Sequence, residues 1–234
     1  MKTLAIYGDS FADPSFGFDA DPTIQSQGWP LLLKEQYNVT LYGQGGSSVY
    51  YSYNNFKQTQ SLYDYIIFVE TTSGRWHHPI IIDSIKYCYC NYNSLDLTEK
   101  QLEVRNHLTP DIKHKLAAIK TWYLELLDLD HDEEMNRLMM AEIKNIRPDA
   151  IIIDLQFIKS WTRLLLLSFS EQLYKDHCEG NLDEIRTICH WPEEFNRVLA
   201  SHLIASLQSR ITVLPDITQG IPLAHDWTYY WKKK

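Results

Sequence analysis

The sequence contains 234 residues, of which 44% are hydrophobic and 22% are charged, so it is long enough for one domain with a substantial core. Its formal net charge is −8 and no basic tract stands out beyond the short tail 232–234, which argues against a nucleic-acid-binding protein. No apolar run approaches the length that spans a membrane and we recognise no signal peptide, so we expect a cytoplasmic protein that does not bind membranes.

Four short apolar runs predict the strands of a sheet, at residues 2–7, 39–42, 65–70 and 150–155. The third run is apolar from 66 to 69 without interruption, which is typical of a strand covered on both faces. Predicted helices alternate with these runs, at residues 29–36, 47–63 (helical or mixed), 111–127, 132–145, 161–173 and from Pro192 onward. The alternation predicts an α/β fold with a central, mostly parallel sheet and helices on both faces.

We predict a single domain over residues 1–234, with an insertion at about 80–109, where no clear period is seen. The aspartates of 128–132 either attract a cation or begin the helix that follows. We expect a solvated helix start, because the segment lacks the glycine and terminal glutamate of a calcium loop. Residues 211–214 are a candidate last strand, and the aromatic tail at 216–234 is expected to pack on the body of the domain.

Cysteine usage indicates neither disulfides nor a metal site. Four cysteines in a chain of this length do not form a disulfide framework. Cys88 and Cys90 have the spacing of half a zinc site, but no second pair with histidine follows at a finger-like spacing. We therefore expect ordinary thiols there, and neither a metal nor an organic cofactor.

The stretch Gly8-Asp9-Ser10 follows the first predicted strand directly. In α/β folds the ligand site lies at the carboxyl ends of the strands, and glycine lets the chain turn so that the next amides point outward. Ser10 is therefore a candidate nucleophile, the alternative being a plain turn that is capped by Asp9. A second glycine cluster, residues 43–47, follows the next predicted strand.

These two segments and a third, residues 189–200, which contains His190, together resemble the sequence blocks of the SGNH, or GDSL-type, hydrolase family, in the family's order. The resemblance implies a flavodoxin-like, three-layer α/β/α sandwich and an esterase. Ser10 would attack an acyl ester, His190 would act as general base and then acid, and the amides of Ser10 and Gly46 would form the oxyanion hole. A small-molecule or carbohydrate ester, such as an O-acetyl group on a sugar, is the implied substrate.

Two positions depart from the family's pattern. The turn after the third strand carries no asparagine to hold the oxyanion, and the hydroxyl groups of Thr71, Thr72 and Ser73 are candidate replacements. Arg75, in the same turn, either stabilises an oxyanion, binds an acidic substrate group or is a solvated loop charge.

The second departure precedes the candidate base. The family places an aspartate three residues before its histidine, and Thr187 stands there. Asp183 is the predicted carboxylate, with Glu184, Asp154 and Asp226 as alternatives, or else a backbone carbonyl orients a Ser–His dyad. We prefer His190 to His225 as the base; the alternative for His190 is a half-buried or helix-capping residue.

The sequence leaves three functions open. An esterase-type hydrolase is the main hypothesis. The two departures support a second, in which the chain is a catalytically weak or inactive binding or assembly protein of the same fold. The third is an acyltransferase that passes the acyl group to a sugar.

Overall fold

The computed structural model describes residues 1–14, 28–75, 80–82, 85–87, 95, 99–100, 102–104, 106–154 and 193–212, with the backbone alone for 80–82, 85–87 and 193–195. The predicted helix at 161–173, the aromatic tail, His190 and Asp183 lie outside the described residues. Ile211 and Thr212, at the start of the candidate last strand, are not in a strand, and the rest of that segment is also outside the described residues.

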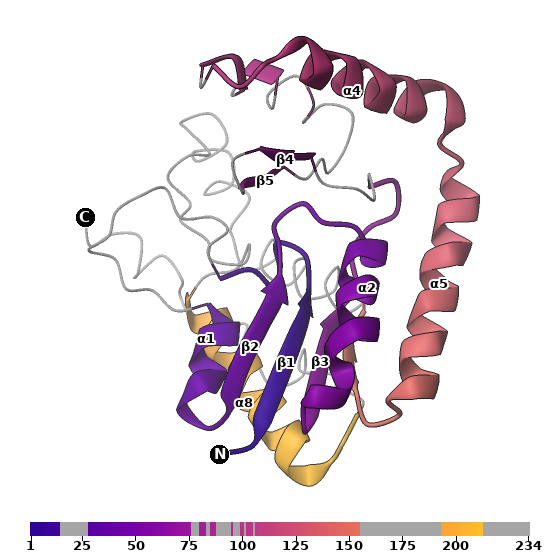
Figure 1. The fold of residues 1–234 in the computed structure, drawn as a ribbon. Coiled ribbons are helices and arrows are strands. Elements are labelled where there is room, and N and C mark those ends of the chain that lie inside the picture. The colour runs from indigo at the N-terminus through magenta and orange to yellow at the C-terminus, as the bar shows by residue number, and fades with distance from the viewer. Residues whose placement is uncertain are drawn as a thin grey trace, which may run out of the picture.

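Four strands form one sheet in which every pairing is parallel, as Figure 1 shows. They are β1 (Thr3–Gly8), β2 (Asn38–Gly43), β3 (Tyr65–Val69) and β6 (Ile151–Ile153), in the order β2-β1-β3-β6. Gly8 lies opposite Gly43 and Val69 lies opposite Ile153, so the carboxyl ends of the strands meet at one edge. The predicted α/β class with a parallel sheet is confirmed.

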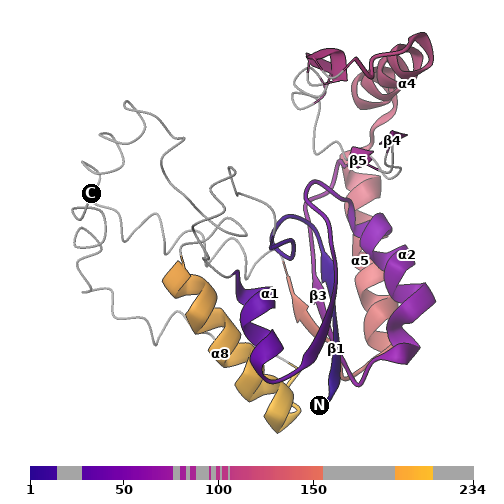
Figure 2. The same ribbon diagram turned by 60° about the vertical axis from the view of Figure 1, so that its left-hand side comes forward.

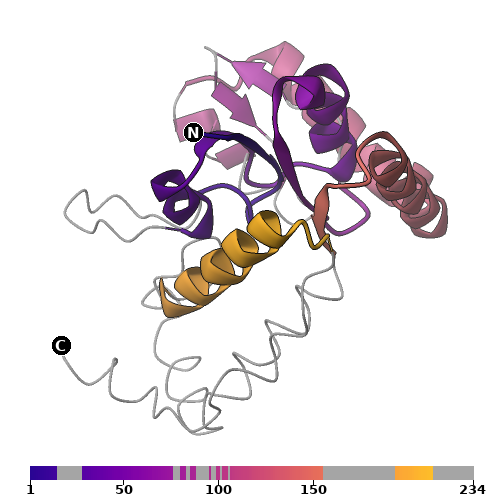
Figure 3. The ribbon, with the colours of Figure 1, turned by 90° about the horizontal axis from the view of Figure 1, so that it is seen from below.

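The apolar runs are continuous because both faces of the sheet are covered. Leu4 and Ile6 of β1 pack in one core cluster, whereas Ala5 and Tyr7 pack in another. The first cluster includes residues of α1 (Trp29–Leu32), of the 3-10 turn η1 (Leu33–Glu35) and of α8 (Glu193–Ser209). The second includes residues of α2 (Val49–Thr59) and α5 (Leu129–Ile146). Figures 2 and 3 show α1 and α8 on the side of the sheet opposite to α2 and α5.

Two hydrogen bonds attach the start of α8 to the chain that follows β1. Asn196 Oδ1 accepts the backbone amide of the fully buried Trp29 at 2.9 Å. The indole Nε1 of Trp29 in turn donates to the carbonyl oxygen of Phe11 at 2.8 Å. The helix predicted from Pro192 is therefore present, and its first turns are fixed near the carboxyl end of β1.

Short elements lie beyond the carboxyl ends of the strands (Figures 1 and 2). The segment predicted as an insertion contains an antiparallel hairpin, β4 (Ile80–Ile82) and β5 (Ile85–Tyr87). The predicted helix 111–127 corresponds to α4 (Pro110–Thr121) and a π-helical turn, η3 (Trp122–Leu126). A separate small apolar cluster holds this part together, formed by Leu95, Leu102, Ile112, Leu116 and Ile119.

The 3-10 turn η2 (Gln60–Leu62) links α2 to β3. None of the helices in the described ranges is long and apolar enough to cross a membrane.

Candidate active site

Three loops meet at the carboxyl edge of the sheet: the first loop (residues 9–14, after β1), the second loop (44–48, after β2) and the third loop (70–75, after β3). The carbonyl oxygen of Gly8 accepts hydrogen bonds from the Gln44 amide at 3.2 Å and from the Ser47 hydroxyl at 3.1 Å. The Gly45 amide donates to Asp13 Oδ2 at 2.9 Å. These bonds hold the first and second loops together.

The glycines that end β1 and β2 are required by close backbone approach. A Cβ atom at Gly43 would lie 2.4 Å from the carbonyl oxygen of Ala12. At Gly8, φ is +156°, and a Cβ atom would lie 2.7 Å from Cβ of Val69 and 2.8 Å from Cβ of Ala12. The two glycines of the sequence motifs therefore let the first loop pack against its neighbours.

The order of the strands changes direction between β1 and β3, and this affects where a ligand can bind at the carboxyl edge of the sheet. From β1 the chain goes outward to β2, and it then crosses back to β3 on the other side of β1. The strand order therefore changes direction between β1 and β3, and in open α/β sheets ligands bind in the crevice at such a switch point. Ser10 and the third loop follow these two strands.

Asp9 is fully buried and both of its carboxylate oxygens accept hydrogen bonds. Oδ1 accepts the Phe11 amide at 3.0 Å, so Asp9 caps the turn, which the sequence left open as an alternative. Oδ2 accepts the Thr71 hydroxyl at 2.7 Å and lies 2.8 Å from Nη1 of Arg75. Asp9 thus also binds the third loop to the first, a role that sequence reasoning did not find.

Arg75 contacts all three loops, and only 11% of its side chain is exposed. Nη1 pairs with Asp9 and also donates to the carbonyl oxygen of Ser47 at 3.0 Å. Nε donates to Thr72 Oγ1 at 3.2 Å. Of the alternatives for Arg75, the solvated loop charge is excluded, because the guanidinium is held by groups of the protein.

Ser10 follows Asp9 in the first loop and is 5% exposed. In the second loop Gly46 is buried, with φ at +74°, in the left-handed region that favours glycine. The Gly45 amide is used by Asp13, whereas the Gly46 amide has no acceptor within the described part of the chain. Of the candidate hydroxyl donors, Thr72 is exposed. Thr71 is buried and already donates its hydroxyl proton to Asp9, so it has no proton left to donate to a ligand.

Helix α5 holds the third loop from the other side. The amide of Gly74, where φ is +75°, donates to Asp132 Oδ2, and Asn136 Nδ2 donates to Ser73 Oγ at 3.2 Å. The sequence predicts a solvated helix start at 128–132, which is confirmed for the exposed Asp128 and Asp130 and wrong for Asp132, which is 8% exposed. The N-cap is Asp128, which accepts the His131 amide at 3.1 Å.

The candidate base and its carboxylate, His190 and Asp183, lie outside the described residues. Asp154, an alternative carboxylate, follows β6 and is exposed. Within the described ranges, no group of three or more His, Cys, Asp or Glu side chains is arranged to hold a metal ion. The sequence matches no model of a known protein family and no curated protein.

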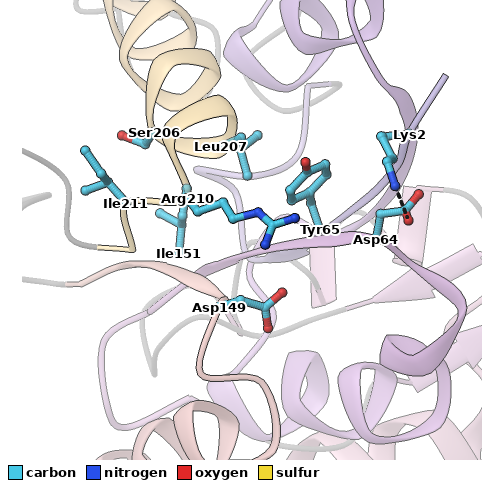
Figure 4. Close-up of a pocket in the computed structure, with 9 residues that line it drawn as sticks. All are labelled: Lys2, Asp64, Tyr65, Asp149, Ile151, Ser206, Leu207, Arg210 and Ile211. Atoms are coloured by element: carbon cyan, nitrogen blue, oxygen red, sulfur yellow. Dashed lines mark hydrogen bonds and ion pairs between the residues drawn. The ribbon is translucent and has the colours of Figure 1, made fainter.

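A pocket of about 280 Å³ lies at the opposite, amino-terminal edge of the sheet (Figure 4). Its lining includes Lys2, which pairs with Asp64 at 3.3 Å, and Arg210, whose side chain extends between Tyr65 and Asp149 in the figure. Because it adjoins the start of β3 and the residues before β6, this pocket is separate from the three loops and contains none of the predicted site residues.

Proposed function

We propose that this chain is a serine esterase-type hydrolase of the SGNH type, built as a three-layer α/β/α sandwich, in which Ser10 attacks an acyl ester. The observation that carries the proposal is the position of Ser10, two residues after the end of the inner strand β1 and at the switch point between β1 and β3. The glycine-containing second loop lies alongside, attached to Gly8 and Asp13. This arrangement combines a nucleophile with backbone donors at one edge of the sheet.

His190 is the proposed general base. A serine hydroxyl is a weak nucleophile until a base takes its proton. In the sequence His190 stands three residues before the start of α8, and a three-residue connection spans at most roughly 10 Å. The first turns of α8 are attached through Asn196 and Trp29 to the first loop, which contains Ser10, and this supports the assignment. Asp183 is the proposed carboxylate partner of His190, and a Ser–His dyad is the alternative.

The proposed oxyanion donors are the amides of Ser10 and Gly46. Preorganised backbone amides stabilise the negative charge that develops on the carbonyl oxygen. The Gly46 amide supports this role because it has no acceptor among the described residues. Attack by Ser10 would release the alcohol with a proton from His190, and water activated by His190 would then release the acid and restore Ser10.

The test is hydrolysis of p-nitrophenyl acetate and of an O-acetylated sugar by the wild type and by Ser10→Ala and His190→Ala. We expect kcat/KM to fall by at least about 1,000-fold in each variant, because neither group can act without the other. Ser201→Ala and His114→Ala, both at exposed helical positions, are matched controls that should keep the wild-type rate. Equal rates in all five proteins would refute the proposal.

A non-catalytic binding protein is the second candidate, and the burial of Ser10, at 5% exposed, is the observation that favours it. A fluorophosphonate probe separates the two functions, since it labels only an activated serine. Labelling of the wild type that is lost in Ser10→Ala supports the hydrolase, and an unlabelled wild type supports the binding protein.

A further inference from the structure

Asp9 and Arg75 form an ion pair beside Ser10 in which each charge is matched by the other. The carboxylate is fully buried; it accepts hydrogen bonds from the Phe11 amide and the Thr71 hydroxyl, and it lies 2.8 Å from Nη1 of Arg75. The guanidinium also donates to Ser47 and Thr72. The two charges therefore balance without any ligand, while Nη2 of Arg75 has no acceptor among the described residues.

The three loops carry few other charges. Arg75 is the only cationic residue in their sequences, residues 9–14, 44–48 and 70–75, whereas Asp9, Asp13 and Glu70 are anionic. The charge of Arg75 is cancelled at short range by Asp9, and like charges repel strongly where water is scarce. A substrate carboxylate bound at Arg75 would have to share the guanidinium with Asp9 and would place two anions close together.

We propose that Asp9 neutralises Arg75 and thereby sets this site to accept uncharged acyl groups and to reject acyl chains that end in a carboxylate. The inference rests on the proposed esterase function and specifies its substrate class. It argues against one of the remaining roles of Arg75, the binding of an acidic substrate group, because Asp9 already balances the charge of the guanidinium.

The test uses two esters of the same acyl chain, p-nitrophenyl methyl adipate, which ends in a neutral methyl ester, and p-nitrophenyl hydrogen adipate, which ends in a carboxylate, and it follows the release of p-nitrophenol. We expect the wild type to prefer the neutral ester by about tenfold or more in kcat/KM. Asp9→Asn should shift the ratio toward the anionic ester, because Arg75 then keeps an uncompensated charge. Arg75→Gln should shift it the other way, and the double variant should return close to the wild-type ratio.

A wild type that prefers the anionic ester, with the preference lost in Arg75→Gln, would overturn the inference. Urea denaturation shows which variants are folded. If either single variant does not fold, the wild-type ratio and that of the neutral double variant still decide the outcome.

A second readout does not depend on catalysis. Inorganic phosphate, titrated calorimetrically, should bind Asp9→Asn and not the wild type, because only the variant leaves the charge of the guanidinium uncompensated. Phosphate binding by the wild type that Arg75→Gln abolishes would refute the charge inference. If neither adipate ester is turned over, the proposed esterase function fails, and the phosphate titration still tests the charge of the site.

Discussion

At the scale of single residues, the lack of a side chain at Gly43 decides how the first loop packs. A Cβ atom there would lie 2.4 Å from the carbonyl oxygen of Ala12, and backbone cannot move aside as a flexible side chain can. We expect Gly43→Ala to lower the free energy of unfolding by about 1–3 kcal/mol, as other overpacked sites do. Urea denaturation measures the change, with Gln44→Ala as the neighbouring control. Equal stability of Gly43→Ala and the wild type would show that the loops can separate at little cost.

At the scale of an element, the C-terminus of α8 contains a strained residue. Arg210 has φ at +55°, and the Ile211 amide closes the helix end by donating to the carbonyl oxygen of Ser206 at 2.9 Å. Glycine is the usual residue at such a position because other residues pay a steric cost. We expect Arg210→Gly to raise the free energy of unfolding by about 1 kcal/mol. Arg210→Ala, which removes the side chain but keeps the Cβ atom, should give no such gain, and a gain of equal size in both variants would contradict the explanation.

At the scale of the whole molecule, charged groups join distant segments at the amino-terminal edge of the sheet. Arg147 donates to the carbonyl oxygens of Gln60, Tyr63 and Asp64 and pairs with Asp149 at 2.8 Å, and its hydrogen bond lowers the pKa of Asp149. A lowered folded-state pKa stabilises the fold above the unfolded pKa, near 3.9, and the effect is lost as pH falls through the folded value. We expect Asp149→Asn to be about 0.5–1 kcal/mol less stable than the wild type at pH 7, with the gap closing toward pH 3. Urea midpoints at several pH values test this, with the exposed Glu103→Gln as a control; a gap that does not depend on pH would contradict it.

The strands were predictable because each contains a short, mainly apolar run, although β2 is interrupted by Thr40. The uninterrupted run from Ile66 to Val69 is typical of a strand between two covering layers. Contacts between distant residues were not predictable. Asp9 and Arg75 are 66 positions apart, and although the sequence places their loops at one edge of the sheet, no local pattern pairs the two side chains. For the same reason Asp132 was expected in solvent, since its burial depends on Gly74, 58 positions away.

The bonds among the three loops have a consequence for how a ligand would bind. Immobilising a flexible side chain at an interface costs roughly 0.5–1.5 kcal/mol of conformational entropy. Asp9, Thr71 and Arg75 have already lost that freedom during folding, because each is held by the other loops in the absence of a ligand. A molecule that fits this edge would therefore lose little affinity to ordering these groups, and one that does not fit would find them unable to adjust.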